Sequence, residues 1–548
     1  MAEKLGRILI LGLDGCTFDI LKPWAEKGIL PNFAKLMENA AWGHLASTYP
    51  PLTMPAWVSF STGKNPGRFG IYGFVSFLDG TYELKHNTHY HVRDQLEFWD
   101  ILNAYGLTCG ILNYPLMDRP VRLDGYCVPG FMAHELSYKT YPEDLREELD
   151  SRVGKYELDA RGSYILDLEQ LTQNALRVMD KRADAIIHLL KRRPVDVFLG
   201  IFTMTDRVLH RMYNMFGPGW AESDDPAENP LAFFFQALDS RIGEILEILD
   251  DDDFLFIISD HGFSHADRAF FINNWLKEKG YLRWKGKGFL SRLGITQNNV
   301  GRVMYKLRLY KRAQLWAPSF LRKAIPPGRN PSHSGVNIID IIYEDRIDWK
   351  NTKAIAIGNG PTAAIYLNTI DRPKGILDPR EANDVCEEII SLLRSEDDPE
   401  TGEKVDVNVR LPEELYMGER LLDVAKFYID FGGDLLPSPS ISEKGKVFGL
   451  HSIHSHAMDG IFLAAHPWIE AGEYQDLTLL DIIPTILHLY DIPLPDEVDG
   501  RVLLEIFHED SDPLSRPVKK DKGPGVKDML ERERIARVAG RLKGGQDI

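Results

Sequence analysis

Three aspartates each follow a short, strongly apolar segment, and together they indicate a cation site. Asp14 follows "ILILGL", Asp206 follows "FLGIFTMT" and Asp260 follows "FLFIIS". Apolar runs of this length, rich in β-branched and aromatic residues, predict buried strands. Because strands of an open α/β sheet present their carboxyl ends to one crevice, we expect the three carboxylates to share space there. One such aspartate alone would be an ordinary turn residue, but three like charges repel strongly unless a cation lies among them.

Histidines near these aspartates indicate which cation would bind. Asp206 and His210 are four residues apart, which places both side chains on one face of a helical turn. His261 directly follows Asp260, and the segment "HSIHSHAMDGIFLAAHP" at 451–467 supplies further imidazoles. Mixed Asp/His ligation suits zinc, manganese or iron better than an all-oxygen calcium site.

One threonine in the segment "YPPLTMPAWVSFSTGKNPGRFGIYGF", residues 49–74, is a candidate nucleophile. Thr53 stands two residues before a proline, at the start of a predicted short helix. A threonine hydroxyl attacks only when a base or a metal activates it. A divalent cation, aided by the positive end of the helix, would lower the pKa of the hydroxyl. The alternative is that Thr53 only caps the helix, and the local sequence fits both interpretations. The ligand candidates elsewhere in the chain favour the nucleophile.

The elements that position these residues follow from the alternation of apolar runs with amphipathic segments. Helical periodicity is clear at 171–193 and 234–251, between the predicted strands. This order predicts an α/β fold with a mostly parallel central sheet covered by helices on both faces. The segment "TKAIAIGNGPTAAIYLN", residues 352–368, predicts two further strands around a Gly-Asn-Gly turn.

Length and composition narrow the class of protein. A chain of 548 residues is long enough for two lobes, or for one large domain with insertions. The 44% apolar and 26% charged content is that of an ordinary soluble globular protein. Four scattered cysteines without CxxC spacing argue against a disulfide framework and a thiolate zinc site. The absence of a signal-peptide pattern and of a run of about 18 apolar residues predicts a cytoplasmic protein.

The charge distribution singles out one basic segment. The formal net charge is −17, yet the stretch from Arg283 to Arg329 contains twelve Lys or Arg and no Asp or Glu. Such a cluster of positive charge predicts a site that binds an anionic ligand or docks on an anionic partner. The alternative is a solvated surface segment. We expect no nucleic-acid role, because the positive charge is confined to this segment. The aromatic residues interleaved with these cations are Trp284, Phe289, Tyr305, Tyr310, Trp316 and Phe320.

This combination suits a peripheral membrane contact at headgroup level or a bulky polyanionic substrate. The sequence accordingly predicts four parts. They are a first part of the catalytic core at 1–275, an inserted basic cap at 276–345, a second part of the core at 346–510 and a charged tail at 511–548.

Five motifs in order resemble those of the alkaline phosphatase superfamily: "LGLDG", "LTMPAWVSFSTGKNPGRFGIYGF", "TMTDRVLH", "SDHGF" and "HAMDGIFLAAHP". The pattern is most similar to the type I phosphodiesterase and nucleotide pyrophosphatase branch, and to a group of predicted phosphohydrolases or phosphomutases beside it. The resemblance covers most of residues 5–270 and 350–505. It implies an alkaline-phosphatase-like α/β sandwich and a metal-dependent phosphoric ester hydrolase.

The resemblance also implies a ligand set for two divalent ions about 4 Å apart. Zinc is preferred, with manganese as the alternative. One ion would take Asp206, His210 and His456, and the other would take Asp14, Thr53, Asp260 and His261. His451 and His454 are alternatives to His456, which is preferred because it stands just before a predicted strand.

The implied activity is a phosphodiesterase that works through a phosphothreonine at Thr53. A phosphomonoesterase or phosphomutase of the same superfamily is the alternative, as is a catalytically silent protein that binds phospholipid or phosphoryl groups. The expected substrate is a small phosphodiester or a lipid-linked phosphate.

This sequence departs from the family pattern at one position. Nucleotide pyrophosphatases usually carry Thr-x-Pro-Asn, and Ala56 replaces the asparagine that binds a phosphoryl oxygen. The candidates to replace this donor are Asn113, Lys64 and Arg68. His265 is expected to lie beside the metal ligands or to face the substrate.

Overall fold

The computed structural model describes residues 5–521 with several gaps. The residues not described within this range are 78–80, 82–83, 88–91, 93–94, 136, 161–165, 217–223, 286–346, 359, 422–423 and 442–444. Only the backbone is described for 84–86 and 451–453. Most of the predicted basic cap therefore lies outside the described residues, with five of the six aromatic residues named above, and so does the tail beyond 521. The side chain of His451 lies outside them as well.

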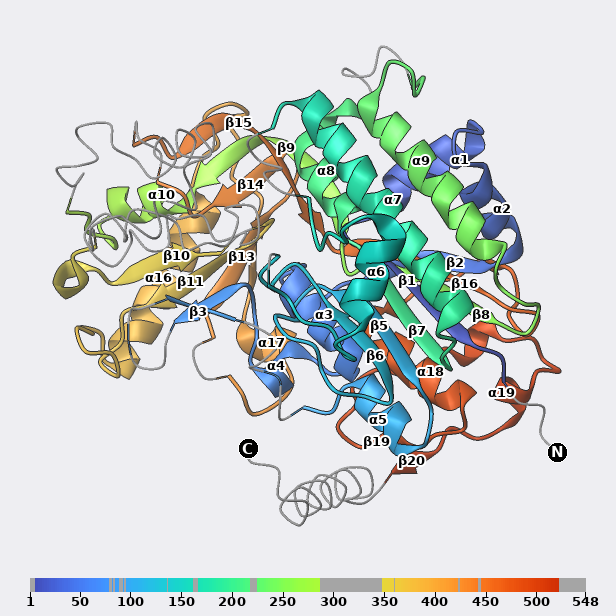
Figure 1. Ribbon diagram of the computed structural model, residues 1–548. Helices are drawn as coiled ribbons and strands as arrows, with labels where there is room; N and C mark the ends of the chain where they lie inside the picture. Colours follow the sequence, from blue (N-terminus) through green and yellow to red (C-terminus); the bar gives the residue numbers. More distant parts are fainter. Residues whose placement is uncertain are drawn as a thin grey trace.

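A nine-stranded, mostly parallel sheet forms the centre of the molecule (Figure 1). Its strands run in the order β17-β2-β16-β8-β1-β7-β5-β6, with β18 paired to β2. The strands are β1 Ile8–Leu13, β2 Ala41–Ala46, β5 Cys109–Tyr114, β6 Gly125–Pro129, β7 Val197–Phe202, β8 Phe254–Ile258, β16 Asp459–Ala465, β17 Gly472–Glu473 and β18 Leu477–Thr478. β1 is parallel to both its neighbours, β7 and β8, and β16 is antiparallel to β8 and β2. The predicted fold class is confirmed.

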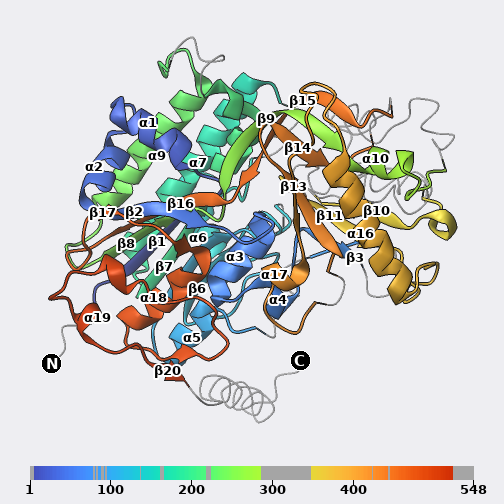
Figure 2. The same cartoon turned by 180° about the vertical axis from the view of Figure 1, so that it is seen from behind.

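Helices cover both faces of this sheet, as Figures 1 and 2 show from opposite sides. The first face carries α1 Phe18–Glu26, α2 Pro31–Asn39, α6 Leu145–Val153, α7 Leu168–Arg192, α8 Met204–Met212 and α9 Pro230–Leu246. The second face carries α3 Thr53–Thr62, α5 Phe98–Ala104 and α18 Ile482–Leu489. Because β1 is apolar at every position except its glycine, it serves both cores: Ile8 and Ile10 face the second core, and Leu9, Leu11 and Leu13 face the first.

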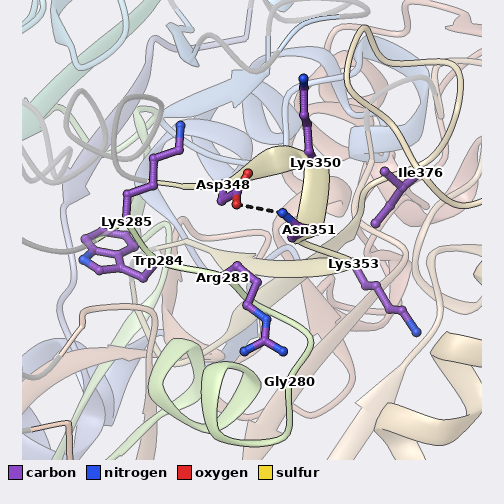
Figure 3. Close-up of a pocket in the computed structure, with 9 residues that line it drawn as sticks. All are labelled: Gly280, Arg283, Trp284, Lys285, Asp348, Lys350, Asn351, Lys353 and Ile376. Carbon is purple, nitrogen blue, oxygen red and sulfur yellow. Dashed lines mark hydrogen bonds between the residues drawn. The ribbon is translucent and has the colours of Figure 1, made fainter.

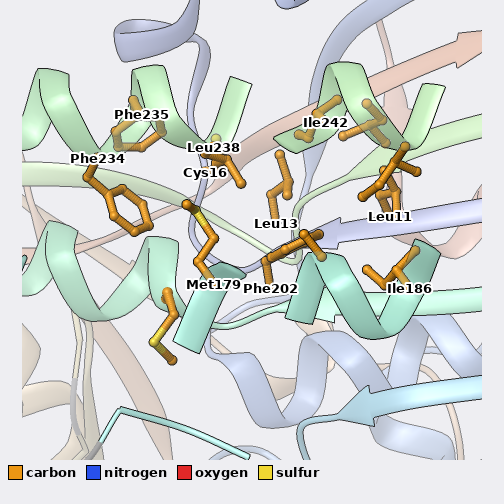
Figure 4. Packing of buried hydrophobic residues seen from close by; sticks show 14 of the residues in the cluster. Leu11, Leu13, Cys16, Met179, Ile186, Phe202, Phe234, Phe235, Leu238 and Ile242 are labelled. Atoms are coloured by element: carbon orange, nitrogen blue, oxygen red, sulfur yellow. The ribbon is translucent and has the colours of Figure 1, made fainter. Parts of the chain in front are cut away.

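The first core holds the carboxyl end of β1 in a fixed position. Leu11 and Leu13 pack in one cluster with side chains of α7 and α9, among them Met179 and Leu238 (Figure 4). Each fully buried side chain of this size contributes about 1.5–3 kcal/mol relative to an exposed one. The end of β1, where Asp14 follows, is therefore anchored by its neighbours.

A smaller lobe is built on two further sheets (Figures 1 and 2). The first has the order β10-β11-β13-β12 and the second β14-β9-β15. Their elements are β9 Gly262–Phe271, α10 Ile272–Glu278, β10 Ala354–Ile357, β11 Ala363–Leu367, α16 Pro379–Ser395, β12 Val407–Arg410, β13 Phe427–Phe431, β14 Leu435–Ser438 and β15 Phe448–Ala457. The two strands predicted within 352–368 are confirmed as the antiparallel pair β10 and β11.

The remaining described elements are short. They are α4 Pro66–Phe69, β3 Val75–Phe77, β4 Leu84–His86, η2 Tyr213–Met215, η3 Trp349–Asn351, α17 Pro412–Leu415, η4 Leu479–Asp481, β19 Leu494–Pro495, η5 Leu504–Ile506, α19 Asp512–Ser515 and β20 Lys520–Asp521. All four cysteines are buried and free. Within the described residues, no helix is both long and apolar enough to span a bilayer. The division into core, cap and tail stays a prediction.

One half-buried histidine that follows the central strand β16 is expected to make the stability of the fold depend on pH. His466 follows β16, its ring stacks on Phe254 at a centroid distance of 3.5 Å, and its Nδ1 accepts the backbone N–H of Trp468. Burial lowers the pKa of His466 to about 4, from an ordinary value of about 6.5. The unfolded chain therefore binds more protons between these values, so stability present above pH ~6.5 is lost as the pH falls towards 4.

We expect the variant His466→Phe to lose less stability than the wild type over this pH range. The measurement is the urea midpoint of unfolding at a series of pH values from 7 to 4.5. If the urea midpoints of the two proteins fall equally as the pH is lowered, His466 takes up no proton on unfolding.

Candidate metal centre

The three aspartates that follow predicted strands meet at one edge of the central sheet. Asp14 directly follows β1, Asp260 lies two residues beyond β8, and Asp206 lies in the first turn of α8, which follows β7. The neighbouring order β8-β1-β7 brings them together. All three are at most 2% exposed. The backbone N–H of Gly15 donates to Asp260 Oδ1 at 3.2 Å, which ties the ends of β1 and β8.

The first group of ligand candidates consists of Asp206, His210 and His456. Potential ligand atoms of the three lie within 4.8 Å of one another. Asp206 Oδ1 is 3.2 Å from His210 Nε2 and 3.3 Å from His456 Nε2. Asp206 and His210 come from consecutive turns of α8, whereas His456 comes from β15 of the smaller lobe. Of the two alternatives to His456, His454 is not in the group, and the side chain of His451 is not described.

The second group consists of Asp14, Asp260 and His261, whose potential ligand atoms also lie within 4.8 Å of one another. His261 Nε2 is 3.3 Å from Asp260 Oδ2 and 3.6 Å from Asp14 Oδ1. The two groups adjoin, because the rings of His261 and His456 stack with their centroids 3.6 Å apart.

Backbone carbonyls fix the tautomers of all three imidazoles. The Nδ1 distances are 3.3 Å from His210 to the carbonyl oxygen of His454, 2.9 Å from His456 to that of Pro51 and 3.0 Å from His261 to that of Gly262. A carbonyl oxygen can only accept, so each Nδ1 carries the proton and each Nε2 presents its lone pair. His210 Nε2 and His456 Nε2 then face each other at 3.1 Å. Two lone pairs at this distance repel, and a shared cation removes the conflict.

The carboxylates show the same need for positive charge. Both side-chain oxygens of Asp14 and Oδ2 of Asp260 are buried without a hydrogen-bond donor. Burial, with the nearby charges of Asp260 and Asp206, raises the pKa of Asp14 well above its ordinary range, and burial raises the pKa of Asp260 to about 8. Burial would also raise the pKa of Asp206, but the adjacent imidazoles and Arg207 hold it well below its ordinary value. The residues present therefore fit divalent cations.

Thr53 lies at this centre and does not act as a helix cap. It is the first residue of α3, the cap position belongs to Leu52, and no side chain caps the helix. The Thr53 hydroxyl is 3.3 Å from His261 Nε2, and the residue is 4% exposed. The cap-only alternative therefore has no support in the structure.

Arg207 is a buried residue of the centre that the sequence analysis missed. Its guanidinium contacts the Asp206 carboxylate, lies 3.3 Å from Asp159 Oδ2 and stacks over the ring of Phe131. By holding Asp206 Oδ2, it leaves Oδ1 directed at the two histidines. The signal in the sequence that could have identified Arg207 is its position directly after the candidate ligand Asp206, in "TDRVLH".

We expect Arg207→Met to weaken metal binding by about 10–100-fold, because groups that orient a ligand contribute on this scale. The measurement is a zinc titration against a chromophoric chelator. The matched control is Arg211→Met on the same helix, since the Arg211 guanidinium contacts the Leu166 carbonyl. Equal affinities for the two variants would show that Arg207 does not position Asp206.

Two of the predicted substrate-binding residues do not reach this centre. Lys64 Nζ is 2.6 Å from Glu497 Oε2, and Arg68 pairs with Asp499 at 2.6 Å. Both residues follow the carboxyl end of α3, whose ten residues place it about 15 Å from Thr53. The structure thus places Lys64 and Arg68 in ion pairs away from Thr53, and their role in substrate binding stays a prediction.

The other two substrate candidates also have partners of their own. Asn113 is fully buried at φ 64°, accepts from the Tyr156 hydroxyl and donates to the Leu158 carbonyl. Its amide is thus used to hold the chain. His265 lies further along β9, where its Nε2 is 2.9 Å from Asp267 Oδ1 and its ring is 5.1 Å from that of His454.

Comparisons with known proteins extend these observations. A family model described as type I phosphodiesterase / nucleotide pyrophosphatase matches residues 8–436. Phosphonoacetate hydrolase from Sinorhizobium meliloti, solved with phosphonoformate, is 13% identical at a TM-score of 0.50, over 87% of this chain and 94% of that one. Murine ectonucleotide pyrophosphatase / phosphodiesterase 5, solved with AMP, is 13% identical at a TM-score of 0.48, over 89% and 95%. A search of curated proteins gives no match. At such identities, the likeness to solved structures concerns the fold.

Proposed function

Because the chain belongs to the type I phosphodiesterase / nucleotide pyrophosphatase family and is therefore placed among phosphoric ester hydrolases, we propose that it cleaves phosphodiesters with Thr53 as the nucleophile. The observation that carries the proposal is the position of the Thr53 hydroxyl, 3.3 Å from His261 Nε2 and beside two adjoining groups of metal-ligand candidates.

The proposal includes two divalent ions, with zinc preferred over manganese. Asp206, His210 and His456 would hold one, and Asp14, Thr53, Asp260 and His261 would hold the other. When bound, the ions would supply positive charge that lowers the pKa of the Thr53 hydroxyl and offsets the charge of the phosphoryl oxygens.

The protein's own residues would then act in two steps. Thr53 Oγ1 loses its proton and attacks phosphorus, and the bond to the leaving alcohol breaks while that alcohol takes up a proton. A phosphothreonine that still carries the second ester group remains. Water then hydrolyses the bond between Thr53 and phosphorus, which restores the hydroxyl and releases a phosphate monoester. The amino end of α3, where Thr53 stands, provides backbone N–H groups and a positive dipole end for the phosphoryl oxygens.

A small hollow of about 40 Å³ lies at residues that precede Thr53 in the chain. It begins at Pro50 and Leu52 and is lined further by Tyr72, Phe74 and Tyr428. A hollow of this volume is too small to enclose an ester group, so the preference for a diester over a monoester rests on the family. The position of Ala56 on the first turn of α3, in place of the family's asparagine, argues against a nucleotide diester as the substrate.

The test compares initial hydrolysis rates of bis-p-nitrophenyl phosphate and p-nitrophenyl phosphate with added zinc, manganese or magnesium. We expect metal-dependent diester cleavage that exceeds monoester cleavage. A monoester preference would replace the proposal by a phosphatase or phosphomutase. If the protein hydrolyses neither ester with any of these metals and also holds no metal ion, a catalytically silent binding protein is favoured.

A further inference from the structure

A basic surface lies where the chain leaves and re-enters the described part of the smaller lobe. An open hollow there is lined by Gly280, Arg283, Trp284, Lys285, Asp348, Lys350, Asn351, Lys353 and Ile376 (Figure 3). We call it the basic hollow. These residues come from the segment after α10, the segment before β10 and the loop before α16.

The backbone beneath the basic hollow is held firmly. Trp284 and Ile347 form an antiparallel bridge, and the N–H of Asp348 donates to the carbonyl of Arg283 at 2.9 Å. The N–H of Lys353 donates to the carbonyl of Tyr281 at 2.7 Å. The cationic side chains are therefore presented from a fixed base.

The basic hollow carries an excess of positive charge that other described residues do not offset. Arg283, Lys285, Lys350 and Lys353 are exposed, and among the described residues none of them forms an ion pair. The only acidic residue that lines the hollow is Asp348, whose carboxylate accepts the Asn351 amide at 2.8 Å. In a chain with a net charge of −17, such a surface attracts anions.

The arrangement of these charges indicates the shape of the anion. In Figure 3, Lys285 and Lys350 extend to one side of the hollow, and Arg283 and Lys353 extend to the other. The four charges thus fan outward and do not converge on one point, as they would around a single phosphate group. An extended surface with many negative charges can meet all of them at once.

Apolar side chains accompany the charges. Trp284 is half-buried in the wall of the basic hollow, and Ile376 at its edge is 36% exposed. Ile370, in the same loop as Ile376, is 60% exposed. An indole and exposed aliphatic groups beside lysines and arginines are the composition of a membrane-interface contact. The sequence continues the pattern, since twelve Lys or Arg and no acidic residue occur from 283 to 329.

We propose that the basic hollow docks the protein onto the anionic headgroup surface of a phospholipid membrane. Lysines and arginines contact lipid phosphates, while Trp284 and Ile376 enter the headgroup layer. The inference is independent of the reaction at Thr53, because it concerns binding of the protein to a surface and no chemical step.

The test is flotation of the full chain with vesicles of phosphatidylcholine alone or with 30% phosphatidylserine, at low and high salt. We expect binding only to the anionic vesicles and its loss at high salt. Each cation near such a surface contributes about fivefold in affinity, so Lys350→Glu with Lys353→Glu is expected to weaken binding at least about 20-fold. The matched control is Lys35→Glu with Lys191→Glu, which changes the net charge equally at exposed sites elsewhere.

Further arms separate the alternatives. Thr53→Ala should bind vesicles as the wild type does, and the Lys350 and Lys353 variant should keep its p-nitrophenyl ester hydrolysis. Equal weakening by the control pair, or unchanged binding by the Lys350 and Lys353 variant, would overturn the proposal. So would release from vesicles by millimolar inorganic phosphate at constant ionic strength, which would indicate a single-anion site, or tighter binding to duplex DNA than to the anionic vesicles.

Discussion

Replacing the nucleophile, Thr53→Ala, is expected to lower kcat for bis-p-nitrophenyl phosphate by at least about 10³-fold. The reason is that the variant lacks the hydroxyl oxygen that makes the first attack on phosphorus. Thr53→Ser keeps a hydroxyl at the same position and should retain far more activity. The measurement is the initial rate at saturating substrate for the three proteins, purified with the same metal.

The control for this prediction is metal content, because Thr53 is also a candidate ligand. If Thr53→Ala holds as many ions as the wild type and still keeps more than about a tenth of its rate, water attacks phosphorus directly and Thr53 is not the nucleophile. Acid quenching of the wild type should in addition trap the p-nitrophenyl phosphoryl group on Thr53, detectable by mass spectrometry of the peptide.

Removal of the proposed divalent ions is expected to have the second large effect. Three buried carboxylates and three imidazole lone pairs converge at this centre. Without cations, their repulsion and lost solvation oppose folding. Treatment with a chelator should therefore lower hydrolysis by at least about 10³-fold and lower the unfolding temperature by a few degrees. The measurements are activity and thermal unfolding before and after dialysis against the chelator.

Re-addition separates ion loss from damage. Zinc, or manganese less effectively, should restore both activity and unfolding temperature to the stripped protein. If the stripped protein hydrolyses the diester at its original rate, the reaction does not use divalent ions. If Asp206→Asn alone loses as much activity as the wild type loses on treatment with the chelator, the ion that the reaction requires is the one held at α8.

The sequence predicts the part of the centre that depends on single elements. Asp14 and Asp260 follow apolar strands, and His210 follows Asp206 by one helical turn, so periodicity alone places them at one sheet edge. His456 is different. It reaches the centre from β15, in a sheet of the smaller lobe, and local patterns do not say which strands of two sheets meet. Only the family resemblance selected it.

The surroundings of three other residues also depend on pairing over long distances in the sequence, which local patterns do not predict. Lys64 and Arg68 stand close to Thr53 in sequence and were natural substrate candidates. Their partners Glu497 and Asp499 lie more than 400 residues further along the chain, and the length of α3 separates them from the centre. Arg207 was missed because a charged residue on an amphipathic helix is normally solvated, whereas Asp159 and Asp206 hold it in the interior.

The fold shows the same limit. Alternating strands and helices predicted the central sheet, and the turn at 358–360 predicted the pair β10 and β11. That this pair joins β12 and β13 in a separate sheet could not be predicted. β9 begins one residue after His261 and continues into the smaller lobe, so β9, together with β15, connects the candidate metal centre to that lobe.

The number of metal ions bound per chain decides between a two-ion centre and a metal-free reaction. Inductively coupled plasma mass spectrometry of wild type, Asp14→Asn and Asp206→Asn, each after zinc loading and gel filtration, would count them. We expect two ions in the wild type, one for each ligand group, and about one in each variant. A wild type that holds no zinc, manganese or iron after loading, yet cleaves the diester, would rule out the two-ion centre.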